Sequence, residues 1–162
     1  MNLRPIEAKD LDEIIEVRTM TRENAFSREA LAQLGITAVS VANLLDTTHR
    51  GWVCEAEGKI AGFAIGDGKT GELWVIAVRP EFEGRRIGSS LLIAVERWLC
   101  SCGWDEFWLW TSADQKKRAF GFYVRHGWTV SEAKGDIVYM KKKSPLGPGR
   151  DVRETYVKGS GC

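Results

Sequence analysis

The sequence has little histidine, only four cysteines and no long apolar run, and each shortage excludes a class of protein. The two histidines and the cysteines form no C-x-x-C pair and no set at metal-ligand spacing, so no metal site is expected. We expect the cysteines to be reduced thiols of a cytosolic protein. No apolar stretch reaches membrane-span length and the N-terminus has no signal-peptide core, so we expect a cytoplasmic protein without a membrane partner.

No charge of one sign dominates the chain. Its 23 Lys and Arg residues balance 22 Asp and Glu residues, which leaves a net charge of +1. A nucleic-acid partner is therefore not expected. Residues 141–143 form a short lysine run, which we interpret as a solvated strand end. With 162 residues, 44% of them hydrophobic, the chain has the size and composition of one globular domain.

One segment, residues 78–92, combines a strand end, a loop rich in glycine and arginine, and a helix start. An apolar run predicts the strand, and Pro80 ends it because proline cannot donate to a sheet ladder. The segment contains neither G-x-x-x-x-G-K-S/T nor G-x-G-x-x-G. A helix beginning near Arg86 would still aim its unpaired first amides and its positive dipole end at the loop, which suits a phosphate or pyrophosphate. An ordinary crossover with a solvated arginine pair is the alternative.

The period of the apolar residues indicates an α/β (α+β) domain over residues 1–143. It should contain about seven strands in a mixed central sheet and about four to five helices. Residues 144–162 lack core-forming periodicity, so we expect a flexible or docking tail, with a homodimer as one way of docking it. The expected strands are 3–6, 52–56, 60–65, 72–78, 107–111, 128–133 and 136–141, and the expected helices are 9–20, 27–35, 37–45, 86–102 and 115–125.

Residues 78–92 resemble the acyl-CoA-binding motif of the GNAT N-acetyltransferase superfamily, (Q/R)-x-x-G-x-(G/A). Glu83 stands at the Gln/Arg position and Arg86 at the first glycine, and both depart from the pattern. Gly88 stands at the second glycine. Gly84 and Gly88 would let the backbone approach a ligand without a Cβ in the way. Because the family contacts its cofactor mainly through backbone amides, the departures weaken the match without removing its physical basis.

A second segment supports the same resemblance. Residues 118–128, RAFGFYVRHGW, are similar to the superfamily's N-x-R-A-x-x-F-Y-x-x-x-G-F. Lys116 stands where Asn is usual and Trp128 where Phe is usual. The resemblance covers about residues 2–143 and implies the GNAT fold, whose sheet splays between the fourth and fifth strands.

The resemblance implies acetyl-CoA as cosubstrate and no metal. The pantetheine arm would pair with the backbone of the central strand, and the pyrophosphate would bind amides of the loop and helix start. The cofactor-binding residues that it implies are Ile76, Ala77, Val78, Glu83, Gly84, Arg85, Arg86, Ile87, Gly88, Ser89, Lys116, Ala119 and Tyr123.

Two residues are candidates for proton transfer. By resemblance, Tyr123 is the general acid that protonates the departing CoA thiolate, since a phenol keeps its proton at neutral pH. Packing of its ring in the core is the alternative. Glu72 is the candidate general base that takes a proton from the amine, directly or through water, and a solvated strand-edge carboxylate is the alternative.

The acceptor is not identified by the sequence. Trp74, Trp108 and Trp110, together with Trp52, leave open an aromatic-walled acceptor pocket, although burial is the default explanation for each. Trp110 stands where ribosomal-protein acetylases of the superfamily carry Glu, which disfavours that subgroup. Glu23, Asn24 and Ser27 are either acceptor contacts or loop and cap residues.

The expected function is acetyl-CoA-dependent N-acetyl transfer to a primary amine of a small molecule or protein. The alternative is a non-catalytic acyl-CoA-binding or interaction module of the same fold.

Overall fold

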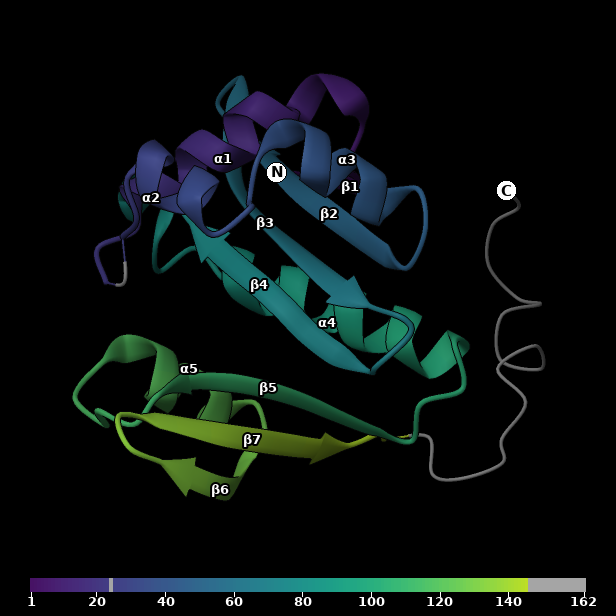
Figure 1. Cartoon of the computed structure of the whole chain (residues 1–162), viewed down its shortest axis with the longest axis vertical. Helices are drawn as coiled ribbons and strands as arrows, with labels where there is room; N and C mark the ends of the chain where they lie inside the picture. Colours follow the sequence, from purple (N-terminus) through teal and green to yellow (C-terminus); the bar gives the residue numbers. More distant parts are fainter. Residues whose placement is uncertain (24, 146–162) are drawn as a thin grey trace.

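The computed structural model describes residues 1–23 and 25–145, which form one seven-stranded sheet with helices on both faces (Figure 1). The strand order is β1-β2-β3-β4-β5-β7-β6, and β4 and β5 run parallel while the other described neighbours are antiparallel. This confirms the expected mixed sheet. The strands are β1 (Asn2–Pro5), β2 (His49–Ala56), β3 (Lys59–Asp67), β4 (Glu72–Val78), β5 (Glu106–Ser112), β6 (Thr129–Lys134) and β7 (Ile137–Lys143). The helices are α1 (Leu11–Met20), α2 (Arg28–Gln33), α3 (Ala38–Leu45), α4 (Ile87–Ser101) and α5 (Arg118–Arg125), with 3-10 turns at Ala8–Asp10 and Pro80–Phe82.

Tight turns join β2, β3 and β4 into an antiparallel meander. Glu57 and Gly58 reverse the chain with φ values of 54° and 78°, the left-handed pair that a two-residue hairpin favours. The next turn, residues 66–71, reads G-x-G-x-x-G, but an antiparallel strand follows it where a dinucleotide-binding loop requires a helix. Asp67 stabilises this turn by accepting a hydrogen bond from the Lys69 amide at 2.8 Å.

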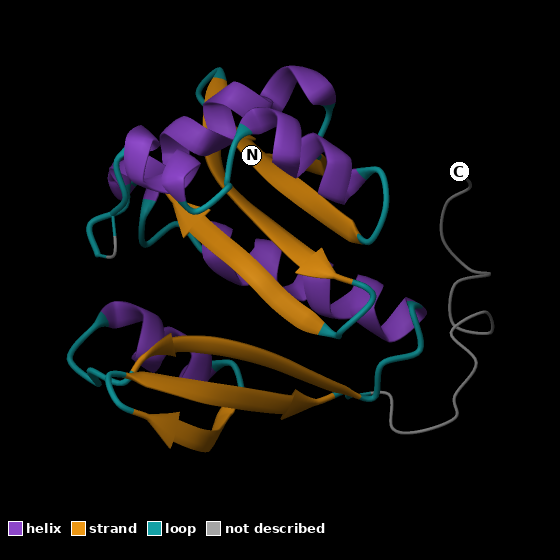
Figure 2. Cartoon of the chain, viewed as in Figure 1, coloured by secondary structure: helices purple, strands orange, loops and turns teal. Residues whose placement is uncertain are grey.

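The sheet splays between β4 and β5, as the sequence resemblance predicts. β4 carries a bulge at Trp74, the residue skipped between two successive register pairs with β3. Among the described residues, β4 and β5 share one register pair, Glu72 with Trp108. Beyond this pair the strands diverge toward their C-terminal ends (Figure 2). The edge of β4 that faces β5 is therefore left without a strand partner over residues 73–78.

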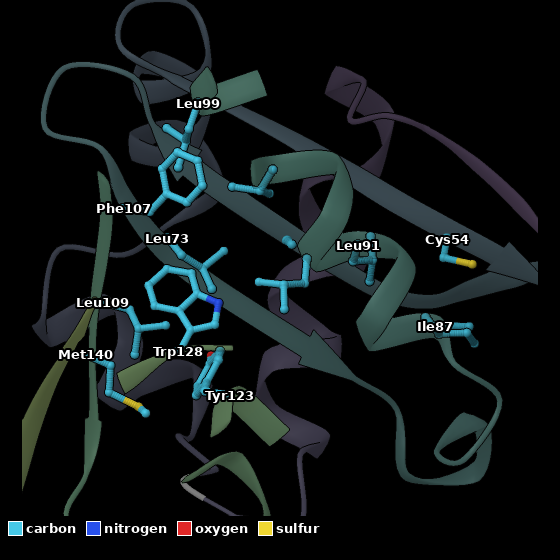
Figure 3. Close-up of a cluster of buried hydrophobic side chains, with 14 of the residues drawn as sticks. Cys54, Leu73, Ile87, Leu91, Leu99, Phe107, Leu109, Tyr123, Trp128 and Met140 are labelled. Atoms are coloured by element: carbon cyan, nitrogen blue, oxygen red, sulfur yellow. The ribbon is translucent and has the colours of Figure 1, made fainter. Parts of the chain in front are cut away.

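Two apolar clusters fill the two faces of the sheet. α1, α2 and α3 cover one cluster, which includes Val17 and Phe63 and draws on β2, β3 and β4. α4 and α5 cover the other, which includes Leu91, Leu109 and Trp128 (Figure 3). This second cluster takes side chains from strands on both sides of the splay, so α4 packs against both halves of the sheet.

Some helices begin two or three residues later than the periodicity predicts. α5 begins at Arg118 and not at Gln115, because the Asp114 side chain first turns the backbone by accepting a hydrogen bond from the Lys116 amide at 3.0 Å. The first α-helix similarly begins at Leu11, after a 3-10 turn. Helix type and order were predicted correctly, and only the observed boundaries differ from the predicted ones.

The described chain continues beyond the last strand to residue 145. Ser144 is buried, and its amide donates to the Asp105 carbonyl oxygen at 2.7 Å. The Ser144 hydroxyl lies 3.1 Å from the Cys100 thiol. The ordered domain therefore includes Ser144, and most of the expected tail, residues 146–162, lies outside the described residues.

Within residues 1–23 and 25–145, no helix combines the length and the apolar character that crossing a bilayer requires. In the same ranges, no three His, Cys, Asp or Glu side chains are grouped so that they could hold a metal ion.

Candidate active site

The turn from β4 into α4 presents a helix N-terminus without a side-chain cap. α4 begins after Arg86, which has a left-handed φ of +61° and makes no capping hydrogen bond, and its first turn has no acidic residue. The Ser90 amide donates to the Arg86 carbonyl at 3.1 Å, so the amides of residues 87–89 have no partner within the helix. Because these amides also lie at the positive end of the helix dipole, they suit an anion. We call residues 83–89 the phosphate corner.

The two glycines of the phosphate corner have different surroundings. Gly84 has a φ of +78°, and a Cβ added to it would meet no heavy atom within 4 Å, so its backbone is open to a ligand. A Cβ added to Gly88 would meet the Phe122 ring of α5 at 3.4 Å. A Cβ at that distance would make an ordinary van der Waals contact, so Gly88 lies beside α5, and its role toward a ligand stays a prediction.

Charged side chains around the corner are engaged in ion pairs. Nη1 of Arg85 lies 2.6 Å from Oε1 of Glu57, in the β2–β3 turn. The Glu83 carboxylate pairs with Arg118 at the start of α5, and its Oε2 lies 3.4 Å from Nε of Arg22, in the loop after α1. Glu83, at the position where the family pattern has Gln or Arg, therefore joins three separate elements beside the corner.

The remaining residues expected at the cofactor occupy two places. Ile76, Ala77 and Val78 pair with β3 on one side, and their other backbone edge faces the splay, where a pantetheine arm could pair with it. Ala119 is partly buried against the α4 cluster, whereas the Lys116 side chain is exposed. The exposed Lys116 is free to approach a negatively charged ligand from the turn before α5.

Tyr123 is buried in α5, and both of the roles expected for it fit its surroundings. Its ring packs edge-on against Trp128 and Phe122, with centroids 6.0 and 5.3 Å apart (Figure 3). Burial raises the pKa of the phenol, and the positive charge of Arg18 partly opposes that shift. A phenol with a raised pKa keeps its proton at neutral pH, as a general acid requires.

Arg18 was not identified as a site residue from the sequence. It extends from α1, where its guanidinium carbon lies 4.9 Å from the Phe26 ring centroid and its Nη1 lies 3.3 Å from Oγ1 of Thr21. Burial lowers the pKa of Arg18, and its interaction with Tyr123 opposes that shift. The sequence does contain one indication, because Arg18 stands where the helical period of Leu11 and Ile14 would place an apolar residue. Its electrostatic contact with Tyr123 places a positive charge near the candidate proton donor.

A serine–histidine pair at the corner was also not predicted. Nδ1 of His126 lies 2.8 Å from the Phe122 carbonyl oxygen, and because a carbonyl can only accept, Nδ1 carries the proton. Nε2 lies 2.9 Å from Oγ of Ser89, within hydrogen-bond distance. This pair connects the end of α5 to the first turn of α4 and orients the Ser89 hydroxyl within the phosphate corner.

Glu72 lies where the splayed strands meet, with Trp108 as its register partner in β5 and Asp67 in β3. Since the next residue, Leu73, points into the α4 cluster, the Glu72 side chain lies on the opposite face of the sheet. Burial, with a smaller contribution from the Asp67 charge, raises the pKa of Glu72 to about 7. A carboxylate that titrates near neutral pH suits a general base, whereas a fully solvated one would remain a weaker proton acceptor.

The four tryptophans expected near the acceptor divide between the two faces. Trp52 packs edge-on against a tryptophan of α4 at 6.1 Å, so it does not belong to a pocket on the face of Glu72. Trp74 lies on the α1–α3 face, 5.2 Å from the His49 ring. Trp108 is half-buried, and Trp110 is 56% exposed. The aromatic surface on the face of Glu72 is therefore built from β4 and β5 without Trp52.

The loop between α1 and α2 supports the structural alternative for its residues. The Ser27 hydroxyl accepts from the Ala30 amide at 3.0 Å and caps α2. Oε2 of Glu23 accepts from the Arg118 amide at 2.8 Å, which fixes the loop against the start of α5. Asn24 lies outside the described residues.

Comparison with known proteins agrees with this geometry. The PaiA N-acetyltransferase of Thermoplasma acidophilum, solved in complex with coenzyme A, is 22% identical, with a TM-score of 0.76 over 88% of this chain and 98% of that chain. The ribosomal-protein alanine N-acetyltransferase of Escherichia coli is 18% identical, with a TM-score of 0.71 over 93% of this chain and 97% of that chain. At these identities the likeness establishes the fold. The sequence model of the acetyltransferase (GNAT) family matches residues 11–128. The chain therefore belongs to the acetyltransferase (GNAT) family.

Proposed function

We propose that the protein is an acetyl-CoA-dependent N-acetyltransferase that transfers the acetyl group directly to a primary amine. The observation that carries this proposal is the unpaired edge of β4, residues 73–78, which leads from the residue after Glu72 toward the phosphate corner. The cofactor's pyrophosphate would bind the open amides of residues 84–89, and its pantetheine arm would pair with the backbone of residues 76–78. The thioester would then lie between Glu72 and Tyr123.

Each proton in the reaction has an assigned place. The Glu72 carboxylate accepts a proton from the ammonium form of the acceptor, and the neutral nitrogen attacks the thioester carbonyl. A backbone amide on the unpaired edge of β4, close to Glu72, polarises that carbonyl, a contribution typically worth a few kcal/mol in the transition state. The C–N bond forms, the C–S bond breaks, and the nitrogen releases its second proton to solvent. Tyr123 donates its proton to the departing thiolate, and solvent restores the phenol.

A non-catalytic acyl-CoA-binding module is the second candidate, and one observation favours it. The carboxylate of Glu83 lies at the phosphate corner and occupies Arg118, a cation that could otherwise meet a phosphate. The pKa of Glu72, raised to about 7, favours the enzyme, because a binding module has no use for a half-buried carboxylate poised near neutral pH. Turnover distinguishes the two candidates.

Thiol release from acetyl-CoA across a panel of amines, with Glu72→Gln as the variant, tests the proposal. We expect kcat/KM of the wild type to rise with pH as Glu72 loses its proton near pH 7, and this limb should be absent from the variant. The variant should lose about 10²- to 10⁴-fold in kcat/KM, the usual contribution of general base catalysis. The loss should shrink for an amine whose own pKa lies below that of Glu72, because such an amine is already neutral.

Glu106→Gln is the matched control, since Glu106 is a carboxylate of β5 on the same sheet face but is paired with Lys141 at 3.0 Å. Its kinetics should be those of the wild type. If no amine in the panel releases thiol although acetyl-CoA binds, the module interpretation replaces the enzyme. If Glu72→Gln keeps the wild-type pH profile, the base lies elsewhere.

A further inference from the structure

One face of β5 and β7 has no helix over it in the described part of the chain. Phe107 and Leu109 of β5, with Val138 and Met140 of β7, point into the cluster under α4 and α5. The opposite face contributes nothing to the cluster beneath α1–α3, which draws on β2, β3 and β4. Figure 1 shows the same division, with α1, α2 and α3 over the β1–β4 half and α5 beside the β5–β7–β6 half.

Three aromatic side chains occupy this uncovered face: Trp108, Trp110 and Tyr139, which we call the aromatic strip. Tyr139 is the register partner of Trp110, and its ring centroid lies 6.2 Å from that of Trp108. The Trp108 indole N–H donates to the Thr70 carbonyl oxygen at 3.0 Å, which fixes the plane of the ring. Trp110 is 56% exposed and is the one aromatic residue among the large apolar side chains that are exposed in the described residues. A rigid, exposed aromatic surface of this kind is typical of a binding site.

The aromatic strip begins beside the candidate base. Trp108 and Glu72 are register partners in parallel strands, so their side chains lie on the same face of the sheet. Trp110 follows two residues further along the same face, a rise of about 7 Å. A ligand lying on the strip would therefore have one end at Glu72 and its body over Trp110.

The charges on this face indicate how many amino groups such a ligand carries. Nζ of Lys141 lies 3.0 Å from Oε1 of Glu106, and Nζ of Lys134 lies 3.3 Å from Oε1 of Glu132. These two carboxylates are thus neutralised by lysines. Asp67, beside Glu72, is buried and its two oxygens accept hydrogen bonds from the Lys69 amide and the Thr70 hydroxyl, so Glu72 is the carboxylate left to meet a cation. A polyamine would need several available carboxylates, whereas one amino group needs one.

We propose that the acceptor is a small primary amine with a flat aromatic body, whose ring stacks on Trp110 and Tyr139 and whose single amino group lies at Glu72. This inference rests on the proposed function and specifies its substrate class. The ring supplies apolar area for the strip to cover, and an ammonium approaching the rings gains a cation–π attraction before it loses its proton.

The test compares 2-phenylethylamine with 2-cyclohexylethylamine, which share the length of the amine arm and differ in the flatness of the ring. Spermidine and a short peptide with a free N-terminus represent the competing acceptor classes. We expect the aromatic amine to have the highest kcat/KM. Trp110→Ala should raise its KM about tenfold, with a much smaller effect on kcat, and Trp110→Phe should recover most of the loss. Because Trp110 is exposed, these variants should fold, which circular dichroism checks.

Ile93→Ala is the matched control, since Ile93 is an exposed apolar residue of α4 at 43% exposure and has no place in the strip. Its kinetics should be unchanged. A second readout, calorimetric titration of 2-phenylethylamine into CoA-saturated protein, measures binding without turnover and should weaken in Trp110→Ala alone. Preferred turnover of spermidine or the peptide, or an unchanged KM in Trp110→Ala, would overturn the acceptor class while acetyl transfer stands. Binding of the amine on the strip without turnover of any amine would support the strip and refute acetyl transfer.

Discussion

At the scale of the residue, Arg86 holds a backbone conformation that usually belongs to glycine. Its φ of +61° lies in the left-handed region, which costs a residue with a side chain roughly 1–2 kcal/mol. Arg86→Gly should relieve that strain while adding unfolded-state entropy worth roughly 0.4–1 kcal/mol. We therefore expect a net stabilisation of about 0 to 1.6 kcal/mol, measured as the free energy of unfolding in urea.

Arg86→Ala separates strain from charge. This control removes the same guanidinium but keeps a Cβ, so it should show no gain in stability. If Arg86→Gly is less stable than Arg86→Ala by the full entropic cost of roughly 0.4–1 kcal/mol, the left-handed position is not strained.

Glu72 and Tyr123 could be proposed as candidates from the sequence because each stands at a fixed place in a motif or strand. Their pKa values could not, since both shifts come from burial, which depends on the packing of distant elements. The same limit applies to Arg18 and to the pair of His126 with Ser89. Their partners come from other helices, and nothing in the local pattern specifies them.

At the scale of the element, Glu83 connects the phosphate corner to α5 and to the loop after α1. Its negative charge should repel the phosphates of a cofactor bound at residues 84–89 and should compete with them for Arg118. Glu83→Gln keeps the shape of the side chain and removes the charge. We expect affinity for CoA to rise about threefold to tenfold at low salt, measured by calorimetry, with the difference shrinking as salt screens the charges.

Glu81→Gln is the comparison for this prediction. Glu81 lies in the adjacent 3-10 turn and faces Lys59 at 3.9 Å, so the variant removes the same charge nearby without touching Arg118. Its CoA affinity should change little. If Glu83→Gln instead weakens CoA binding, Glu83 holds Arg118 in a productive position and the two charges act together.

Element order was predictable because apolar residues repeat with a period of two in the strands and near 3.6 in the helices. The residues at which the helices and strands begin and end were less predictable. The side chain of Asp114 forms a turn that delays α5, a local competition that periodicity does not register. The neighbour of Gly88 also required the structure, because the ring nearest to it belongs to Phe122, 34 positions later in the chain.

At the scale of the whole molecule, a sheet that splays open needs another element to hold its halves together. α4 does this through the apolar cluster and through Glu96, a buried carboxylate. Glu96 Oε1 accepts from the Trp128 indole N–H at 3.0 Å, and its two oxygens lie 2.9 and 2.8 Å from Nζ of Lys142. These partners are 32 and 46 positions away in the chain, so the sequence alone could not pair them.

Glu96→Ala would leave the Lys142 ammonium and the Trp128 N–H without their acceptor, and we expect a loss of about 3 kcal/mol in the free energy of unfolding in urea. Glu96→Gln keeps an oxygen for Trp128 and should lose less. The double variant Glu96→Leu with Lys142→Met should recover much of the loss, because a well-packed apolar pair can replace a buried ion pair. Glu106→Ala, which breaks an exposed pair, should cost under about 1 kcal/mol. If Glu96→Ala costs no more than Glu106→Ala, the apolar cluster alone joins the two halves of the sheet.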